Sequence, residues 1–458
     1  MASPASPRPP RLAPVSSVLL GVLMCLAALL SAGPAQAAPL DLMQAYEAAR
    51  QYDPGLRGAR AELDVGREHE VLARSALLPS VSGFYTTSRN QADVTQAGGS
   101  TEQRSYKGYN ASLQLRQALF HPEGQAAYRM GQARTSASKA RFAAQEQELI
   151  IRLFEAYATV LVQQEQLGLA QAQLTSLTEQ HKANERLLAK GEGTRTEVLE
   201  TLAKLNGARA QVIETSDLVD TARNRLSSLT GVPATGLAGL SPGFDSPDNT
   251  LPPMAELVDM VQRHHPLLRE LRQELDAVRE EVRRAEAGHL PRVDLLVNAG
   301  QAESDSITSF RQKNHSTSVS LQVSVPLYTG GAVQAQARQA LGRQAVVQAE
   351  LDARTADLLV ELQRQHQLHH SSGLRLVALG HAVASARLLV EATRKSVSGG
   401  VRTNLDVLDA QERLTQTLRD LAQTRYAHLQ AGLRARSAAG ILSEADLRRV
   451  AARFAGAP

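Results

Sequence analysis

Two kinds of hydrophobic pattern alternate along the chain, and each predicts a different element. Two stretches, at about 122–190 and 334–398, carry apolar residues at the spacing of an α-helix. Roughly 70 residues at ~1.5 Å each would form a rod on the order of 100 Å long. In the first rod the predicted buried seam recurs every seven residues, at Leu153, Val160, Leu167, Leu174, His181 and Leu188.

Four shorter stretches show the two-residue alternation of β-strands, at about 80–92, 106–120, 292–304 and 315–328. In the last of these, Val319, Leu321 and Val323 share one face, whereas Ser320 lies on the other. Pro326 is tolerated only near the end of such a strand, because proline cannot donate to a ladder. We therefore predict two β-hairpins, each with one apolar face.

Each long helical pattern stops at glycine and then restarts with the sequence Thr-x-x-acid. A glycine stop followed by a capping box predicts the tip of a helical hairpin. The return helices are expected at about 197–229 and 405–439. The residues that carry these signals are Gly191, Thr194 and Glu197 in the first tip and Gly400, Thr403 and Asp406 in the second.

The same order of signals occurs twice, which indicates a duplicated unit. Gly191 and Gly400 are 209 positions apart, and Leu78-Pro79 recurs at Leu290-Pro291 with an offset of 212. Each unit is expected to begin with short helices, at about 41–52 and 254–264. We predict a signal peptide at 1–37, a first structural repeat at 38–235, a linker at 236–253, a second repeat at 254–440 and a C-terminal segment at 441–458.

The first residues have the features of an export signal. Arg8 and Arg11 form a basic start, residues 15–30 are an apolar core, and Ala35-Gln36-Ala37 fits a cleavage site. The only cysteine, Cys25, lies in this segment, so the mature chain is expected to lack disulfides, Cys-ligated zinc and thiol catalysis. Its surroundings make a poor lipoprotein site, and we expect an exported protein without a lipid anchor.

The composition of the remainder excludes several classes of protein. Without the two arginines of the signal, the 50 basic residues become 48 against 46 acidic residues, so nothing favours nucleic acid as a partner. After that signal no further run of 18 apolar residues predicts a spanning helix. With 3% aromatic residues and no tryptophan, the chain favours long, thin helical packing over a large globular core.

Four strands with an apolar face leave two open sheet edges. In a membrane an unpaired edge is prohibitive, so the sheet must close with strands from other chains. Two chains would supply eight strands and three would supply twelve. The alternation alone leaves both possibilities open.

In the order of its motifs, the chain resembles the TolC family of outer-membrane channel-tunnels over nearly the whole mature sequence. The motifs are Asp41-Leu42-Met43-Gln44-Ala45, Leu77-Leu78-Pro79, Leu113-Gln114-Leu115, His289-Leu290-Pro291, Val325 to Gly331, and Val401 to Ala410. The resemblance implies a mainly α fold with membrane β structure. It also implies a homotrimer whose twelve-stranded barrel, four strands per chain, in outer-membrane lipid continues into a coiled-coil α-helical tunnel.

The resemblance assigns a pore role to two aspartates of the second tip. Asp406 and Asp409 match the carboxylates that ring the periplasmic constriction in the family, where such a ring favours cations and binds multivalent ions. The residues themselves allow a plainer interpretation. Asp406 is the acid of the capping box opened by Thr403, and Asp409 fits a solvated helix face.

The resemblance also implies a latch at the tips. Arg402 matches an arginine that links neighbouring coils, and its partners align with Thr196 and Glu197. The family tyrosine five residues before this arginine is replaced by Val397, so its hydrogen bond is missing from the expected closed state. Besides forming the turns, Gly191, Thr194, Gly400 and Thr403 are expected to present the tips to a periplasmic adaptor.

Other candidate chemistry is weak. His366, His369 and His370 have a spacing that suits a metal on one helix face, but no nearby cysteine or carboxylate completes the site, so we expect no metal and no cofactor. Nothing resembles an activated nucleophile or an acid–base pair, and catalysis is not expected. Aromatic residues in the strands fit either an interfacial girdle or scattered packing, namely Phe84, Tyr85, Tyr106, Tyr109, Phe120 and Tyr328.

The expected function is a passive exit duct in the bacterial outer membrane that extends into the periplasm. It would dock onto an adaptor and an inner-membrane pump of the ABC type, for type I protein secretion, for efflux of small molecules, or for both. One alternative is a channel dedicated to drug efflux. A second, of a different class, is a periplasmic coiled-coil adaptor without a pore, which would leave the four strands unexplained.

Overall fold

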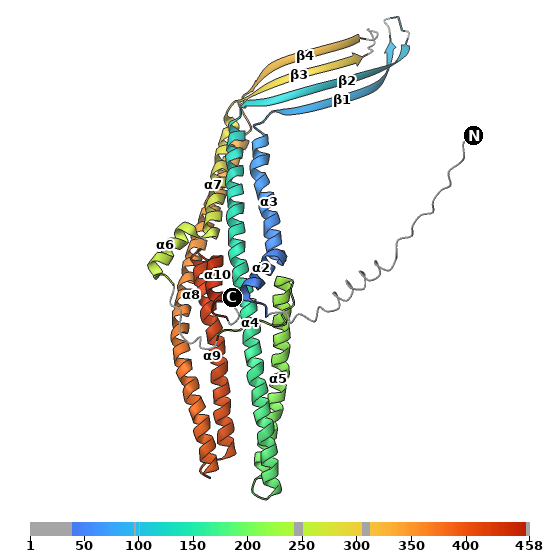
Figure 1. The fold of residues 1–458 in the computed structure, drawn as a ribbon. Helices are drawn as coiled ribbons and strands as arrows, with labels where there is room; N and C mark the ends of the chain where they lie inside the picture. Colours follow the sequence, from blue (N-terminus) through green and yellow to red (C-terminus); the bar gives the residue numbers. More distant parts are fainter. Residues whose placement is uncertain (1–38, 96–97, 100, 242–250, 305–311, 455–458) are drawn as a thin grey trace, which may run out of the picture.

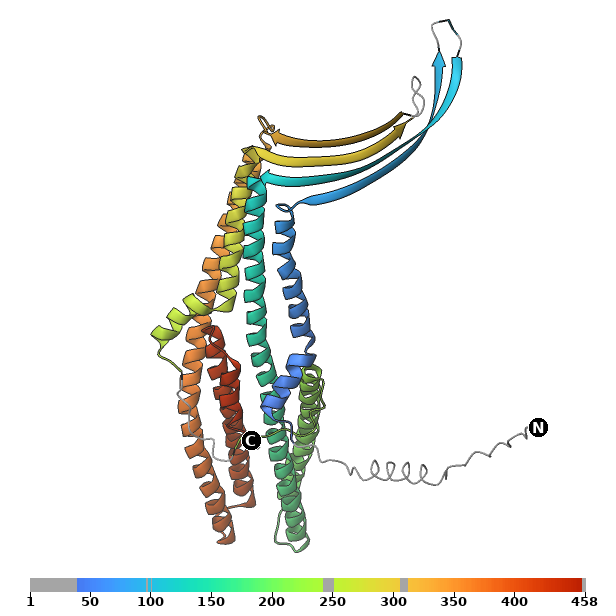
Figure 2. The ribbon, with the colours of Figure 1, turned by 45° about the horizontal axis from the view of Figure 1, so that its top comes forward.

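The structure is a computed structural model that describes residues 39–95, 98–99, 101–241, 251–304 and 312–454. The predicted signal peptide and residues 242–250 of the predicted linker lie outside the described residues. Long helices run side by side as an extended bundle, and a sheet leaves one end of it (Figure 1). The sheet curves away from the bundle axis (Figure 2).

Two helical hairpins form the shaft. Helix α4 (Pro122–Ala189) returns as α5 (Arg195–Thr230), and α8 (Ala332–Ser398) returns as α9 (Asn404–Ala438). Lengths of 68 and 67 residues for α4 and α8 correspond to rods on the order of 100 Å. The bounds agree with those predicted from the sequence to within a few residues.

Shorter helices flank the upper half of the shaft. These are α2 (Leu42–Tyr52) and α3 (Pro54–Ser75) in the first repeat, and α6 (Met254–His264) and α7 (Pro266–Glu286) with the short η1 (Ala287–His289) in the second. In each repeat a proline starts the second helix, preceded by a side chain that accepts a backbone N–H. Asp53 Oδ2 accepts from Leu56 at 2.8 Å, and His265 Nδ1 accepts from Leu267 at 3.2 Å.

The sheet is antiparallel in the order β1-β2-β3-β4, built from β1 (Ser80–Thr95), β2 (Thr101–Phe120), β3 (Arg292–Ser304) and β4 (Gln312–Ser324). Its register aligns Val81, Leu115, Val297 and Val319 across all four strands. The neighbouring row is polar and contains Ser82, Gln114, Asn298 and Ser318. The sheet therefore has one apolar and one polar face, as a barrel wall between lipid and water requires.

One strand ends earlier than predicted, and the aromatic residues, for which the sequence left two interpretations open, divide between the faces of the sheet. Strand β4 ends at Ser324 rather than 328, because Pro326 has no N–H for the ladder. Four of the six aromatic residues divide between the two faces of the sheet, which favours scattered packing over one girdle. The register places Tyr85 and Tyr109 on the apolar face and Phe84 and Tyr106 on the polar face.

Three segments meet around the middle of the shaft and form a belt there. They are the start of the described chain near Leu40, the linker near Ala238 and the C-terminal end near Phe454. The Tyr157 hydroxyl on α4 is buried, lies 2.9 Å from the carbonyls of both Leu40 and Ala238, and donates to them. The edge of Phe454 packs on the Tyr157 ring at a centroid distance of 5.7 Å. Helix α10 (Glu444–Ala451), which the sequence analysis left within an unassigned C-terminal segment, completes this belt.

The predicted seam of α4 is correct in its upper part and wrong near the tip. Leu153 and Val160 are fully buried, but Leu188 is 38% exposed. Near the tip the buried positions are Ala170, Leu177 and Asn184, three residues later in the repeat. A straight α-helix drifts by about 20° per heptad relative to a strict seven-residue repeat, so the face that meets α5 is not the face that meets the upper bundle.

The elements have the same lateral order at every level of the molecule. Packing contacts give α3-α4-α7-α8 above and α5-α4-α9-α8 below, and the sheet has the order β1-β2-β3-β4. The layer therefore has one edge made of β1, α3 and α5 and another made of β4 and α8. In Figure 1, α3 and α5 lie on the right of the bundle and α8 on the left, while β1 is the lowest and β4 the uppermost strand.

Candidate functional site at the hairpin tips

The first tip is built by the glycine and capping signals that the sequence contains. Gly191 has φ +77°, a left-handed conformation that favours glycine. Thr194 is the N-cap of α5, and the Glu197 N–H donates to its hydroxyl at 3.2 Å. In return, Glu197 Oε2 accepts from the Thr194 N–H at 2.9 Å and from its hydroxyl at 3.0 Å. The Glu197 carboxylate is thus engaged within its own tip.

The second tip repeats this arrangement. Gly400 has φ +73°, and its N–H donates to the Val397 carbonyl at 3.0 Å to close the turn. Thr403 caps α9, and Asp406 Oδ2 accepts from the Thr403 N–H and from its hydroxyl, each at 2.9 Å. The plainer interpretation of Asp406 as a capping acid is therefore correct. A pore-lining role is compatible with it, because both cap contacts go to Oδ2.

Asp406 is held in its charged form. Hydrogen bonds from the Thr403 backbone and hydroxyl lower the pKa of the Asp406 carboxyl below its ordinary value of 3.8, and the nearby Arg402 guanidinium acts in the same direction. Because the pKa is depressed, the carboxylate stays ionised above that ordinary value. It gains a proton only as the pH falls through the lowered pKa.

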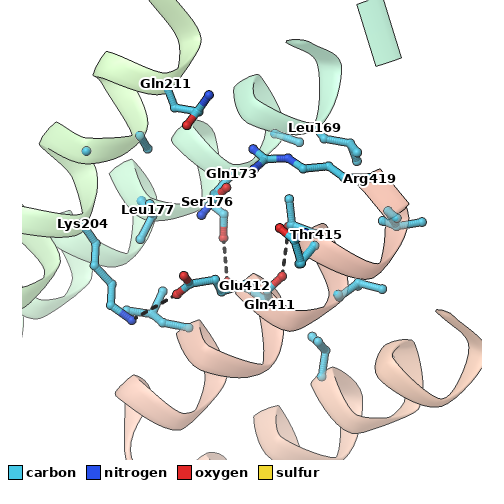
Figure 3. Close-up of a pocket in the computed structure, with 18 of the residues that line it drawn as sticks. Leu169, Gln173, Ser176, Leu177, Lys204, Gln211, Gln411, Glu412, Thr415 and Arg419 are labelled. Atoms are coloured by element: carbon cyan, nitrogen blue, oxygen red, sulfur yellow. Dashed lines mark hydrogen bonds and ion pairs between the residues drawn. The ribbon is translucent and has the colours of Figure 1, made fainter. Parts of the chain in front are cut away.

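Asp409 has a partner that the sequence analysis missed. Lys204 on α5 places Nζ 2.8 Å from Asp409 Oδ1 and 3.7 Å from Glu412 Oε2, so one lysine joins the first hairpin to two acids of α9 (Figure 3 shows the Glu412 contact). No sequence signal connects residues 205 positions apart. Asp409 is exposed, as the solvated-face interpretation expects, and it also takes part in an ion pair between hairpins.

Within one chain the described residues give no hydrogen bond or ion pair between Arg402 and either Thr196 or Glu197. The Arg402 side chain is exposed, and its charge acts on Asp406 of its own tip. The Arg402 link between neighbouring coils therefore stays a prediction.

Beside this ion pair, the two hairpins line an open cavity of about 500 Å³, to which Lys204 and Glu412 themselves contribute (Figure 3). On one side, Leu408 of α9 is buried against Leu177 of α4 and against Leu205 and Ala208 of α5. Across the gap, the Ser176 hydroxyl donates to Gln411 Oε1 at 3.1 Å. The second hairpin is thus fastened to the first by a small apolar cluster and by polar contacts.

The histidine cluster does not form a metal site. His369 turns inward and stacks on His428 of α9, with ring centroids 4.1 Å apart and planes inclined by 14°, while His370 is exposed. The Ser372 hydroxyl lies 3.0 Å from His428 Nδ1. Among the described residues, no group of three or more His, Cys, Asp or Glu side chains is placed to hold a metal ion.

Comparison with known proteins gives a consistent result. A family model described as outer membrane efflux protein matches residues 45–232 and residues 257–441. The alkaline protease secretion protein AprF of Pseudomonas aeruginosa is 39% identical over 421 residues, 91% of this chain and 87% of AprF. The proteases secretion protein PrtF of Dickeya chrysanthemi is 38% identical over 444 residues, 95% of this chain and 96% of PrtF.

Solved structures have the same fold. The outer membrane channel CmeC of Campylobacter jejuni superposes with a TM-score of 0.76, although only 15% of residues are identical. The match covers 90% of this chain and 89% of the CmeC chain. The strands, both long hairpins and the flanking helices therefore form a known channel fold.

Proposed function

The chain belongs to the outer membrane efflux protein family, and from that membership we propose that it forms a trimeric exit duct for the secretion of proteases. Membership confirms the family expected from the sequence motifs and makes the chain a transport protein rather than an enzyme. It is a channel of the outer membrane that extends into the periplasm. A periplasmic adaptor without a pore, the alternative of a different class, is thereby set aside.

The two edges of the layer support the proposed trimer. On the α8 edge, Val346, Val360, Leu374 and Leu388 recur every fourteen residues, each between 63% and 68% exposed. Although it has no continuous apolar run of that length, helix α8 contains an 18-residue window that is apolar enough on average to cross a membrane, and only 22% of that window is buried. Such a stripe on a shaft helix requires a covering surface.

The opposite edge offers a matching surface. Val65 and Leu72 on α3 are seven residues apart, and Leu199 and Ile213 on α5 are fourteen apart, and all four are more than half exposed. Contact between two different edges of identical chains is head-to-tail, and it closes into a ring when the rotation between successive chains adds up to a full turn. The same contact would bring β1 of one chain beside β4 of the next, so that three chains complete a twelve-stranded barrel.

The proposed cargo follows from the relatives. AprF and PrtF, whose names state protease secretion, match 91% and 95% of this chain at 39% and 38% identity. This observation carries the proposal of type I protease secretion over dedicated drug efflux. The partners proposed with it are a periplasmic adaptor, which meets the tips at Gly191, Thr194, Gly400 and Thr403, and an inner-membrane ABC pump.

The tips supply the proposed gate. Asp406 and Asp409 would form an acidic constriction, and Arg402 would bridge to Thr196 or Glu197 of a neighbouring tip when the mouth is shut. Adaptor contact would compensate for the lost bridges and shift the equilibrium toward the open state. The two proposed repeats, 38–235 and 254–440, are supported by the two separate family matches. Removal of residues 1–37 stays a prediction.

Secretion in a reconstituted system tests the proposed cargo. A bacterial strain without its own exit duct would receive the chain together with a protease, its ABC pump and its adaptor. We expect protease activity in the medium only when all components are present. Restored export of small drugs without protease would instead favour dedicated drug efflux. A trimer in the outer membrane that restores neither would contradict the proposed role in export.

A further inference from the structure

Close to the tips, an ion pair with one positive and two negative groups joins the two hairpins. Lys204 Nζ lies 2.8 Å from Asp409 Oδ1 and 3.7 Å from Glu412 Oε2. The lysine side chain is 32% exposed, whereas the two acids are 54% and 64% exposed. A single cation, the most covered of the three groups, thus serves two carboxylates of the other hairpin.

The acids of α9 form a row that leads away from the tip. Asp406, Asp409 and Glu412 are three residues apart in sequence, so they lie on neighbouring parts of one helix face. Asp406 is engaged by its own cap, whereas Lys204 joins the other two to α5. The negative charge of this row is therefore partly offset only while Lys204 is in contact with Asp409 and Glu412.

Separation of the hairpins would break this contact. Asp409 is adjacent to Leu408, which is buried among Leu177, Leu205 and Ala208 of the first hairpin. This cluster and Lys204 border the cavity of about 500 Å³ between the hairpins (Figure 3). Movement of α9 away from α5 would remove Leu408 from its cluster. The same movement would separate Asp409 and Glu412 from Lys204.

We infer that Lys204 is a latch that also sets the charge of the mouth. In the closed state it holds α9 against α5 and offsets the acidic row. When the hairpins separate, Asp409 and Glu412 lose their counter-charge, so the open mouth attracts cations more strongly than the closed mouth does. The inference rests on the proposed gated channel and adds a residue that couples opening to ion selectivity.

The size of the effect follows from the exposure of the pair. One exposed ion pair shifts an equilibrium only a few-fold, but three symmetry-related copies act on the same opening, which gives about tenfold in the open-to-closed ratio. Salt screens partly exposed charges, so the effect should shrink as ionic strength rises from about 0.1 M to 1 M.

The test uses single-channel recording with a cycle of variants, namely Lys204→Gln, Asp409→Asn and both together. Lys204→Gln is expected to raise the open-to-closed ratio about tenfold and to move the reversal potential in a salt gradient toward cation selectivity. Asp409→Asn should raise the ratio but lower cation selectivity. The double variant should open no more often than either single variant.

A matched control and a rescue distinguish the latch from a general loss of charge. Lys182 on α4 is exposed and has no ion pair among the described residues, so Lys182→Gln removes the same charge from the same hairpin. Exchange of the charges, Lys204→Glu with Asp409→Lys, should restore closure. If Lys204→Gln matches Lys182→Gln in both open-to-closed ratio and reversal potential, the inference about Lys204 is wrong. The proposed channel function would not be contradicted by that result.

Hydrogen exchange tests the same contact without a need for conductance. In the purified trimer, Lys204→Gln should increase amide exchange at residues 399–410 relative to Lys182→Gln, because α9 loses its hold on α5. If no protein conducts, the proposed channel is in doubt while this measurement still decides the latch. Equal exchange in the two variants would overturn it.

Discussion

Replacement of both Asp406 and Asp409 with asparagine is expected to weaken block of the channel by a trivalent cation at least about tenfold. In the proposed trimer these residues bring six carboxylates together, and hard multivalent cations prefer several oxygen ligands with full negative charge. Asparagine keeps the size and the capping acceptor, so the folded tip should survive. Block would be measured by titration of the cation during single-channel recording, beside reversal potentials in a salt gradient.

The block should also have a characteristic pH dependence. Because the pKa of Asp406 is lowered by the Thr403 hydrogen bonds, its charge is fully present above the ordinary carboxyl pKa. Block should therefore persist from about pH 7 to about pH 5 and fade only in stronger acid. A matched control neutralises two exposed acids of the first tip, Glu192→Gln with Glu200→Gln. If this control abolishes block as fully as the aspartate variant does, the ring does not lie at Asp406 and Asp409.

Placing charge on the apolar stripe of α8 is expected to prevent assembly. Val360 and Leu374 are each more than 60% exposed in the single chain, on the helix face opposite the one that meets α9. In the proposed ring they are covered by the α3 and α5 edge of the next chain. Burial of an unpaired carboxylate costs several kcal/mol in each of three interfaces, which exceeds what a trimer can absorb.

The molar mass of the assembly would be measured in detergent by size-exclusion chromatography coupled to light scattering. The double variant with Val360→Asp and Leu374→Asp should elute as a monomer that retains the circular dichroism spectrum of a helical protein. The apolar pair Val360→Ile with Leu374→Met should remain trimeric, because it preserves hydrophobic character and nearly the same volume. Intact trimers of the aspartate variant would show that this stripe faces solvent, and the proposed arrangement of edges would have to be abandoned.

The sequence could predict those features that depend on neighbours along the chain. The turns at Gly191 and Gly400, the capping boxes and the alternation in β4 each arise within a few residues, where backbone conformation and local hydrogen bonds decide the outcome. The capping pattern at Ser443 and Asp446 was also a readable signal for the start of α10. The helix that follows it has only eight residues, which gives a weak periodic pattern.

Features that depend on tertiary placement could not be predicted. Lys204 meets Asp409 across two hairpins, and Tyr157 meets the carbonyls of Leu40 and Ala238, only because separate segments are brought together. The seam of α4 shifts because a different partner helix covers each part of it. His369 packs on His428 rather than beside its sequence neighbours, which removes the metal site that its spacing alone allowed.

Single-channel conductance of the detergent-purified trimer in a planar bilayer tests the central claim most directly. The account predicts discrete, cation-selective steps from the parent protein, and more frequent opening once Arg402→Ser removes the proposed latch between neighbouring tips. A tightly shut mouth can silence the parent, so the two proteins must be recorded together. Silence from both, in folded and membrane-inserted trimers, would contradict the account of this protein as an exit channel.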